Sequence, residues 1–274
     1  MTEKKLSKIA IHTITNRPWT TEQCIDEYSK AGIGGITFWR YSFEDRDPKK
    51  VGDQARESGL NVVSVARGGF FAAESKEDRK KAIDDNKRAI DETHSVGAPS
   101  LVLVCGSNKH QSLNTSRNQI QDGIAECLDH AKDAGVILAI EPLHPMYASE
   151  RSAVNSMAQA NAICENLENH PNVGIALDVY HTWWDDRLKE EIARSFNNGN
   201  LSSYHICDWL SPMEDMLNDR GLMGEGSIDV DQISEWVIES GFTGFHEVEI
   251  FSERWWKTDQ HDYLKKIISY FDKN

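Results

Sequence analysis

The sequence lacks the features that mark several common classes of protein. Its five cysteines form no CxxC pair and no repeating spacing, which argues against a cysteine-based zinc site or a disulfide framework and favours reduced thiols in the cytoplasm. No apolar run reaches membrane-spanning length, and the charged first residues lack the apolar core of a signal peptide. Neither a GxGxxG motif after the first expected strand nor a P-loop motif is present, so nothing indicates a nucleotide site.

Basic residues are too few for a nucleic-acid partner. The chain carries 30 Lys and Arg against 44 Asp and Glu, a formal net charge of -14. Proteins that bind a phosphate backbone present a basic face, so we expect no nucleic-acid partner, and the same charge argues against an anionic membrane. The hydrophobic content of 39% is sufficient for a large core. We therefore expect a cytoplasmic globular protein that acts on a small molecule.

Short apolar runs alternate with amphipathic segments eight times along the chain. The expected strands are residues 8–11, 35–39, 61–66, 101–105, 136–141, 173–178, 201–206 and 244–250. The expected helices are residues 20–32, 47–59, 75–97, 116–135, 153–169, 187–196, 230–241 and 262–271. Repeated strand–helix units without a linker predict an α/β fold, a single (β/α)8 TIM barrel over residues 1–274. An open doubly wound sheet is the alternative, but polar residues at strand ends favour the barrel.

The last four expected strands each carry a metal-capable side chain near the C-terminal end. VILAIE ends in Glu141, VGIALD ends in Asp178, LSSYHICD carries His205 and FHEVEIF carries Glu249. A carboxylate at the end of a buried strand is costly unless it is paired, and four such positions are hard to read as ordinary polar residues. Three carboxylates and one imidazole suit Mn²⁺, which we expect, or Mg²⁺ or Co²⁺, with Zn²⁺ acceptable.

The eighth strand offers two carboxylates for this set. Glu247 and Glu249 are two residues apart and therefore face the same side of a strand. Glu249 lies nearer to the C-terminal end, where a barrel keeps its site. We assign Glu249 to the metal and leave Glu247 as a deeper carboxylate paired inside the barrel.

Several segments resemble one known family. They are EPLHP, LDVYHTWW, HICDW, DRGLMGEGSID and EVEIF, within residues 141–251, and they are similar to the xylose isomerase-like TIM-barrel superfamily, also called sugar phosphate isomerases/epimerases. The resemblance implies that the same four residues bind the metal and that Glu141 and Glu249 also move protons at a ketose carbon. It further implies substrate contacts from His181 and Arg220, whose alternatives are a solvent-facing histidine and a surface ion pair.

The loop after the fifth strand departs from the epimerase pattern. Epimerases of the family usually carry a neutral or amide residue and a second Glu there, whereas this chain has His144 followed by Pro145 and MYASER. A histidine at this position resembles the α-subunit of C-glycoside deglycosylating enzymes, which act on 3-oxo-glycosides with a small β-sandwich partner subunit. His144 is therefore a candidate catalytic residue, the alternative being a loop histidine that donates to a carboxylate behind the ligands.

Further candidates lie at other strand ends. Asp208, three residues after His205, either binds a substrate hydroxyl or caps its loop. Trp184 suits the apolar face of a sugar, or else loop packing or a subunit interface. The same alternatives hold for its neighbours Trp183, Trp209, Trp255 and Trp256. The early strands end near three residues that are expected at the edge of the pocket, namely His12, Trp39 and Arg67.

We predict a divalent-metal-dependent sugar isomerase or epimerase. A base removes the proton next to a sugar carbonyl, and the metal stabilises the resulting enediolate. The alternative is a metal-dependent lyase that eliminates the aglycone from a 3-oxo-glycoside, for which His144 suits the role of base or proton shuttle. The net charge disfavours an abasic-site nuclease, and the complete ligand set disfavours a non-catalytic sugar-binding subunit. The expected partner is a sugar or an oxidised glycoside, with a homo-oligomer or a small partner subunit compatible with the tryptophan pairs.

Overall fold

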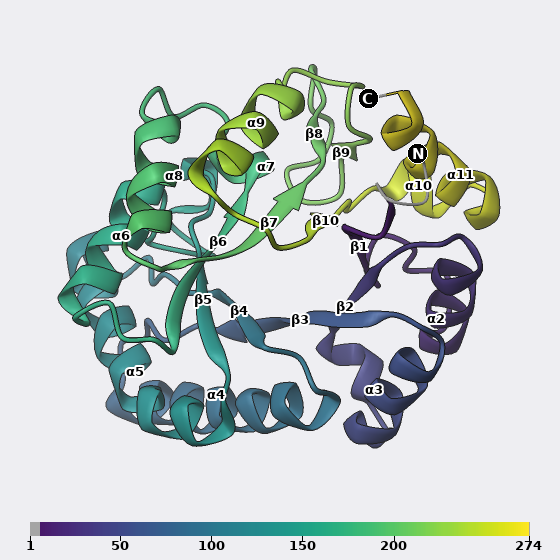
Figure 1. The fold of residues 1–274 in the computed structure, drawn as a ribbon. Coiled ribbons are helices and arrows are strands. Elements are labelled where there is room, and N and C mark those ends of the chain that lie inside the picture. Colours follow the sequence, from purple (N-terminus) through teal and green to yellow (C-terminus); the bar gives the residue numbers. More distant parts are fainter. Residues whose placement is uncertain (1–5, 274) are drawn as a thin grey trace.

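The computed structural model describes residues 6–273, and its centre is a closed barrel of eight parallel strands (Figure 1). The strands are β1 (Ile9–His12), β2 (Gly35–Trp39), β3 (Asn61–Gly69), β4 (Ser100–Val104), β5 (Ile137–Glu141), β6 (Val173–Asp178), β7 (Leu201–Ile206) and β10 (His246–Val248). They follow one another around the barrel in chain order, and β10 closes it by pairing with β1. The predicted (β/α)8 barrel is confirmed, and the open sheet is excluded.

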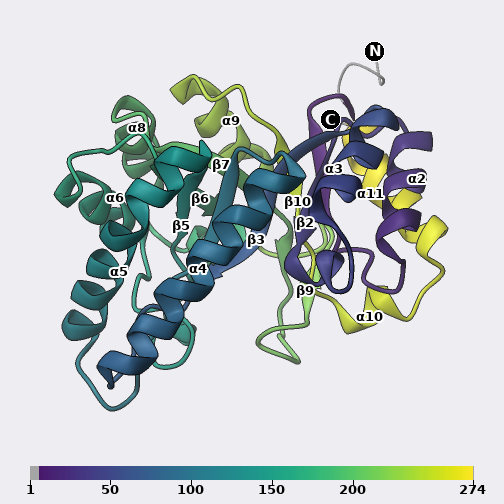
Figure 2. The ribbon, with the colours of Figure 1, turned by 90° about the horizontal axis from the view of Figure 1, so that it is seen from below.

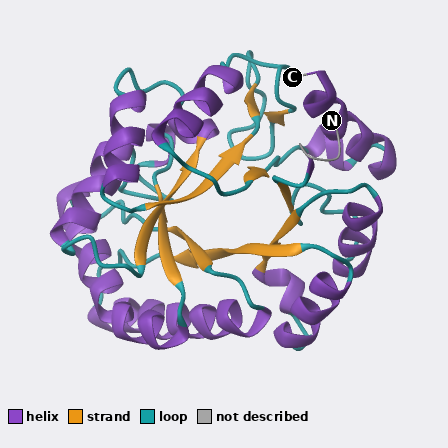
Figure 3. Ribbon diagram, in the orientation of Figure 1, coloured by secondary structure: helices purple, strands orange, loops and turns teal. Residues whose placement is uncertain are grey.

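A long helix follows each strand, so that the helices surround the strands (Figure 3). They are α2 (Thr21–Lys30), α3 (Pro48–Glu57), α4 (Lys76–Val96), α5 (Leu113–Ala134), α6 (Met157–Asn166), α8 (Leu188–Asn197), α9 (Val230–Ser240) and α11 (Gln260–Lys273). The helices pack on the outside of the strands and on one another; α4, for example, contacts β3, α3 and α5 (Figure 2). The apolar faces that the sequence pattern predicts are buried by this packing.

Six shorter elements that the sequence pattern did not predict lie in loops that follow the strands. They are η1 (Arg40–Phe43), η2 (Pro145–Tyr147), α7 (Val179–Thr182), β8 (Asp208–Trp209), β9 (Arg220–Gly221) and α10 (Glu253–Trp256). Each is too short to show a helical or strand periodicity in the sequence. Together they build the C-terminal face of the barrel, where the site residues lie.

Local capping sets the ends of the helices. The Thr20 side chain accepts the N–H of Gln23, and the Gln23 side chain accepts the N–H of Thr20, which is a capping box at the start of α2. α4 ends at Gly97, whose left-handed conformation (φ 83°) favours glycine. α6 begins at Met157, later than expected, because the Ser156 side chain caps the helix there.

The interior of the barrel differs from its outer surface. The large apolar side chains form one cluster between strands and helices. Inside the barrel the apolar side chains are small, and Ala66, Val102, Ala139 and Ala176 form a separate cluster in contact with Trp39. These small side chains leave space inside the barrel, and the polar side chains at the strand ends occupy that space.

The described helices and cysteines agree with two expectations from composition. None of the helices within residues 6–273 is long and apolar enough to cross a membrane. All five cysteines are buried and none is in a disulfide.

Candidate active site

The four predicted ligands converge at the C-terminal end of the barrel. Glu141 and Asp178 are the last residues of β5 and β6, and His205 pairs with Asp178 in the register of β7. Glu249 follows β10, where its N–H donates to the carbonyl of Ile206 (3.1 Å). One ligand atom from each of the four residues lies within 4.8 Å of the others, and all four side chains are buried. We call these residues the four-residue cluster.

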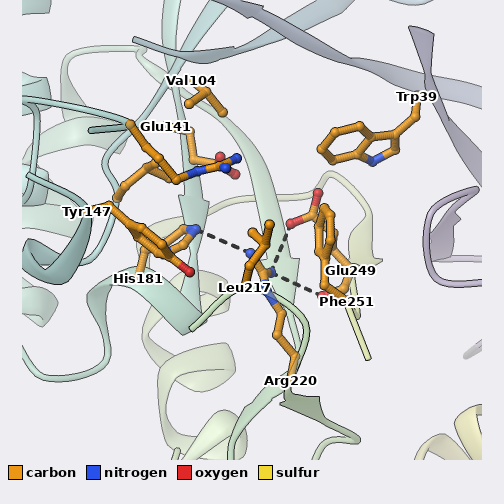
Figure 4. A pocket seen from close by; sticks show the side chains of 11 residues that line it. Trp39, Val104, Glu141, Tyr147, His181, Leu217, Arg220, Glu249 and Phe251 are labelled. Carbon is orange, nitrogen blue, oxygen red and sulfur yellow. Dashed lines mark hydrogen bonds and ion pairs between the residues drawn. The ribbon is translucent and has the colours of Figure 1, made fainter. Parts of the chain in front are cut away.

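Short polar contacts tie the four-residue cluster together. His205 Nδ1 lies 3.1 Å from Glu141 Oε1. Arg220 Nη1 donates to Asp178 Oδ2 at 2.8 Å and to Glu249 Oε2 at 2.9 Å, and the contact to Glu249 is drawn in Figure 4. Because Arg220 is buried with its partners, its positive charge acts on them with little screening by water.

These charges shift the pKa values of the cluster in different directions. Burial raises the pKa of Asp178 to about 6, against the opposing positive charge of Arg220. Burial also disfavours the ionised form of Glu249, but the positive charges of His12 and Arg220 hold its pKa well below the usual range. Burial would lower the pKa of His205, yet the neighbouring carboxylates raise it to about 10. Positive charges are therefore needed at this site to balance the buried carboxylates.

The donor set fits a divalent cation. Three carboxylates at this separation repel one another, and a cation among them offsets the repulsion. Nε2 of His205 is buried without a hydrogen-bond partner in the described part of the chain. The ring nitrogens of His12 lie 3.0 Å from Glu249 Oε1 and 3.3 Å from Glu247 Oε2. The cluster therefore combines oxygen-rich ligation with one imidazole, that of His205.

Glu247 lies deeper in the barrel than Glu249. Its Oε2 accepts hydrogen bonds from the hydroxyls of Thr37 (2.6 Å) and Ser64 (2.9 Å), and it lies 3.3 Å from His12 Nε2. The barrel interior thus satisfies this carboxylate, whereas Glu249 is the one that groups with the other three cluster residues. This geometry supports the prediction that Glu249 is a metal ligand.

A pocket opens beside the cluster, and the carboxylates of Glu141 and Glu249 line it. Tyr147 and His181 lie on one side of it and Trp39 on the other, as Figure 4 shows. The indole Nε1 of Trp39 and Nδ1 of His181 are buried without a partner among residues 6–273. Both atoms are suited to bind oxygen atoms of a polar ligand such as a sugar.

His181 and Arg220, the two residues expected to contact substrate, both line the pocket. Arg220 Nη2 lies 3.3 Å from His181 Nε2. Burial and the positive charge of Arg220 lower the pKa of His181 well below its usual value. A neutral ring that accepts from Arg220 at Nε2 carries its proton on Nδ1, the atom without a partner. His181 is therefore arranged as a hydrogen-bond donor.

Asp208 is not among the residues that line the pocket. Its Oδ1 accepts the backbone N–H groups of Trp209 (2.7 Å) and Ile228 (2.9 Å), and its Oδ2 accepts those of Gly224 (2.9 Å) and Gly226 (2.7 Å). Both oxygens are thus committed to the loop before α9. The geometry favours the loop-cap alternative for Asp208 over contact with a substrate hydroxyl.

Replacing Asp208 with alanine should lower the free energy of unfolding by about 2–3 kcal/mol, because buried backbone donors lose their acceptor. Urea unfolding followed by circular dichroism measures this change. Asp208→Asn, which keeps one acceptor oxygen, should lose less. An alanine variant with normal stability and a raised KM would instead indicate a direct substrate contact.

His144 and Trp184 also lie outside the lining of the pocket. The His144 ring is 4.8 Å from the ring of Trp209 and 5.9 Å from that of Trp184, and its Nδ1 accepts the N–H of Met146 (3.2 Å). Burial lowers the pKa of His144, which favours a neutral ring. The Trp184 indole donates to the carbonyl of His181 (2.8 Å), so this ring braces a pocket residue.

Six lining residues were not among the sequence candidates. They are Val104, Leu143, Tyr147, Arg151, Leu217 and Phe251. Tyr147 and Arg151 lie in the MYASER segment of the loop after the fifth strand, and Phe251 follows the ligand-bearing end of the eighth. Their place in loops that follow barrel strands was the available signal for these three residues.

Comparisons with known proteins agree with this description. The chain matches the family model of the xylose isomerase-like TIM barrel over residues 25–273. It is 25% identical over 237 residues to the L-ribulose-5-phosphate 3-epimerase UlaE of Salmonella typhi, covering 80% of this chain and 79% of that protein. The crystal structure of protein SMc04130 from Sinorhizobium meliloti 1021 is similar at 42% identity with a TM-score of 0.93, over 97% of this chain and 98% of that one. The IOLI protein, solved with a bound zinc atom, shares the fold at 20% identity with a TM-score of 0.83, over 97% and 96% of the two chains.

Proposed function

This chain belongs to the xylose isomerase-like TIM-barrel family, and we propose that it is a divalent-metal-dependent sugar isomerase or epimerase. The observation that carries the proposal is the convergence of Glu141, Asp178, His205 and Glu249 within 4.8 Å beside a pocket. Its similarity to an L-ribulose-5-phosphate 3-epimerase supports a ketose as the substrate class.

The four-residue cluster would hold the metal ion. A divalent cation there would act as a Lewis acid on a carbonyl oxygen and stabilise the negative charge that develops when the neighbouring C–H bond breaks. We favour Mn²⁺ because three of the four ligands are carboxylates. The zinc atom bound by the IOLI protein on the same fold supports a divalent ion and leaves Zn²⁺ as an alternative.

Glu141 and Glu249 would move the proton. They come from β5 and from the end of β10, which β6 and β7 separate in the barrel, so they reach the pocket from different directions. One carboxylate can remove the proton next to the carbonyl while the other returns it to the opposite face. The low pKa of Glu249, held down against burial by His12 and Arg220, keeps this carboxylate ionised as a base. His181 and Trp39 would hold the sugar by their unpartnered N–H groups.

The proposal is tested by hydrogen exchange. Mn²⁺-loaded protein is incubated in D₂O with a ketohexose or L-ribulose 5-phosphate, and proton NMR follows deuterium incorporation next to the carbonyl. We expect exchange and a new epimer or isomer, because a proton that leaves to a carboxylate returns in part as deuterium. Absence of exchange across a panel of ketoses and ketose phosphates, with metal bound, would contradict the proposal.

The lyase alternative is tested in the same spectrometer. Elimination from a 3-oxo-glucoside would release the group at C1, and His144→Ala should abolish that release if His144 is the base. The position of His144 against Trp209 and Trp184, outside the pocket lining, favours the carboxylates as the proton-transfer groups instead.

A further inference from the structure

Two arginines near the pocket have no acceptor for their N–H groups. Within residues 6–273, the guanidinium groups of Arg67 and Arg151 have neither a hydrogen bond nor an ion pair, although both side chains are half-buried. By contrast, Arg40, also half-buried, lies 3.0 Å from Asp85 and 2.6 Å from Glu92. Partial burial of a cation is unfavourable unless an anion pairs with it. The chain has 44 acidic residues, yet none within residues 6–273 forms an ion pair with Arg67 or Arg151.

Arg151 lines the pocket, and Arg67, which is not a lining residue, lies in β3 within reach of the charges of Arg151 and Glu141. Arg151 lines the pocket together with Glu141 and Tyr147, and its carbonyl accepts the N–H of Gly106 just after β4. Arg67 lies in β3 where the register with β4 shifts, so it has no paired residue on that strand. Such irregularities redirect a side chain and are common beside active sites.

Aromatic rings support the two guanidinium groups. Arg67 Cζ lies 4.4 Å from the ring centre of Phe70, and Arg151 Cζ lies 5.7 Å from that of Tyr147. Contact with a ring face positions an arginine without using its N–H donors. Phe70 adopts a φ of 56°, which is unfavourable for a residue other than glycine, and the residue is 39% exposed.

The two positive charges act on each other. Burial and the charge of Arg151 lower the pKa of Arg67 to about 10. The charge of Arg151 also contributes to the lowered pKa of His181, after burial and Arg220. The carboxylates of Glu141 and Asp85 oppose this effect on Arg67, but neither forms an ion pair with it within residues 6–273. Two like charges without a paired carboxylate favour an anion from outside the protein.

We propose that Arg67 and Arg151 form a subsite for an anionic group of the substrate, a phosphate or a carboxylate, at the end remote from the carbonyl. The inference rests on the proposed function, because it assumes that the carbonyl end of a ketose lies at the four-residue cluster. Guanidinium groups bind both anions through paired, charge-assisted hydrogen bonds. The subsite would make an anionic ketose a better substrate than its neutral counterpart.

Three substrates that differ only at C6 test the subsite: D-fructose, D-fructose 6-phosphate and D-fructuronate, with L-ribulose and its 5-phosphate as a second pair. The measurement is kcat/KM for deuterium exchange by the metal-loaded protein. We expect at least one anionic substrate to exceed its neutral counterpart by about tenfold or more. A preference for the phosphate or for the carboxylate identifies the anion.

The double variant Arg67→Gln/Arg151→Gln should bring the ratio of anionic to neutral kcat/KM to within about twofold of one, whereas general damage to the pocket lowers both values in proportion. Arg17→Gln is the matched control, because Arg17 is exposed, lies 5.0 Å from the Trp256 ring and does not line the pocket. Turnover without an anionic preference, or a preference that survives the double substitution, overturns the subsite and leaves the proposed function intact.

A binding measurement distinguishes failure of the subsite proposal from failure of the proposed function. Inorganic phosphate is titrated into the Mg²⁺-loaded protein at constant ionic strength, and the melting temperature is recorded. Stabilisation of the wild type that the double variant lacks supports the subsite even if no sugar is turned over. Equal responses of wild type and double variant to phosphate, in a protein that turns over no ketose, overturn it.

Discussion

Replacing Glu249 with glutamine should lower kcat by about a thousandfold, within the range for loss of a positioned acid–base group. Glutamine preserves the size of the side chain but removes both a charge of the four-residue cluster and the proposed base. The same substitution should weaken metal binding, since Glu249 groups with Glu141, Asp178 and His205. Steady-state kinetics and calorimetric titration with Mn²⁺ measure the two effects.

Glu247→Gln is the matched control, on the same strand and two residues away. Glu247 is held by Thr37 and Ser64 and forms a second close group with His12 and His205, so it supports a ligand from behind. Residues that support a ligand in this way usually change metal affinity by about 10–100-fold. If the Glu247 variant were inactive and the Glu249 variant active, Glu247 rather than Glu249 would be the metal ligand and base.

Replacing Arg220 with methionine should destabilise the metal-free protein by about 3–5 kcal/mol, the usual effect of removing one partner from a buried ion pair. Arg220 Nη1 lies within 3 Å of both Asp178 and Glu249. Without it, Asp178 loses its nearest positive charge and Glu249 keeps that of His12 alone at comparable distance. A bound divalent ion would offset that loss of positive charge. Mn²⁺ should therefore raise the melting temperature more in the variant than in the wild type.

Scanning calorimetry after chelation, with and without added Mn²⁺, measures this difference. Arg46→Met is the control, because Arg46 pairs with Glu22 at the exposed surface, where an ion pair contributes no more than about 1 kcal/mol. An Arg220 variant as stable as the wild type without metal, or equally stabilised by Mn²⁺, would contradict the electrostatic description of the site.

The fold and the four-residue cluster could be predicted because they follow from short-range patterns. An apolar strand that ends in a carboxylate, as at Glu141 and Asp178, carries its own signal, and parallel strands bring such ends together. The register of β7 and β10 then places His205 beside Glu247 and leaves Glu249 beyond the paired strand.

Other parts of the site depend on contacts that the sequence does not display. Asp208 stands three residues after a cluster member, yet its oxygens are taken by backbone N–H groups of a loop up to 20 residues further on. Tyr147 and Arg151 lie in an irregular loop whose path no periodicity describes. His144 was a candidate from its position after Glu141 and from the resemblance to deglycosylating enzymes, whereas its packing against Trp209 is a tertiary contact.

The central claim is that the four-residue cluster binds a divalent ion on which proton transfer depends. Its most direct test measures bound metal and deuterium exchange into a ketose on the same samples of wild type and Asp178→Asn, before and after chelation. We predict one ion per chain in the wild type, loss of exchange when it is removed, recovery with Mn²⁺, and neither tight binding nor exchange in the variant. Exchange that persists in the metal-free protein would contradict the claim.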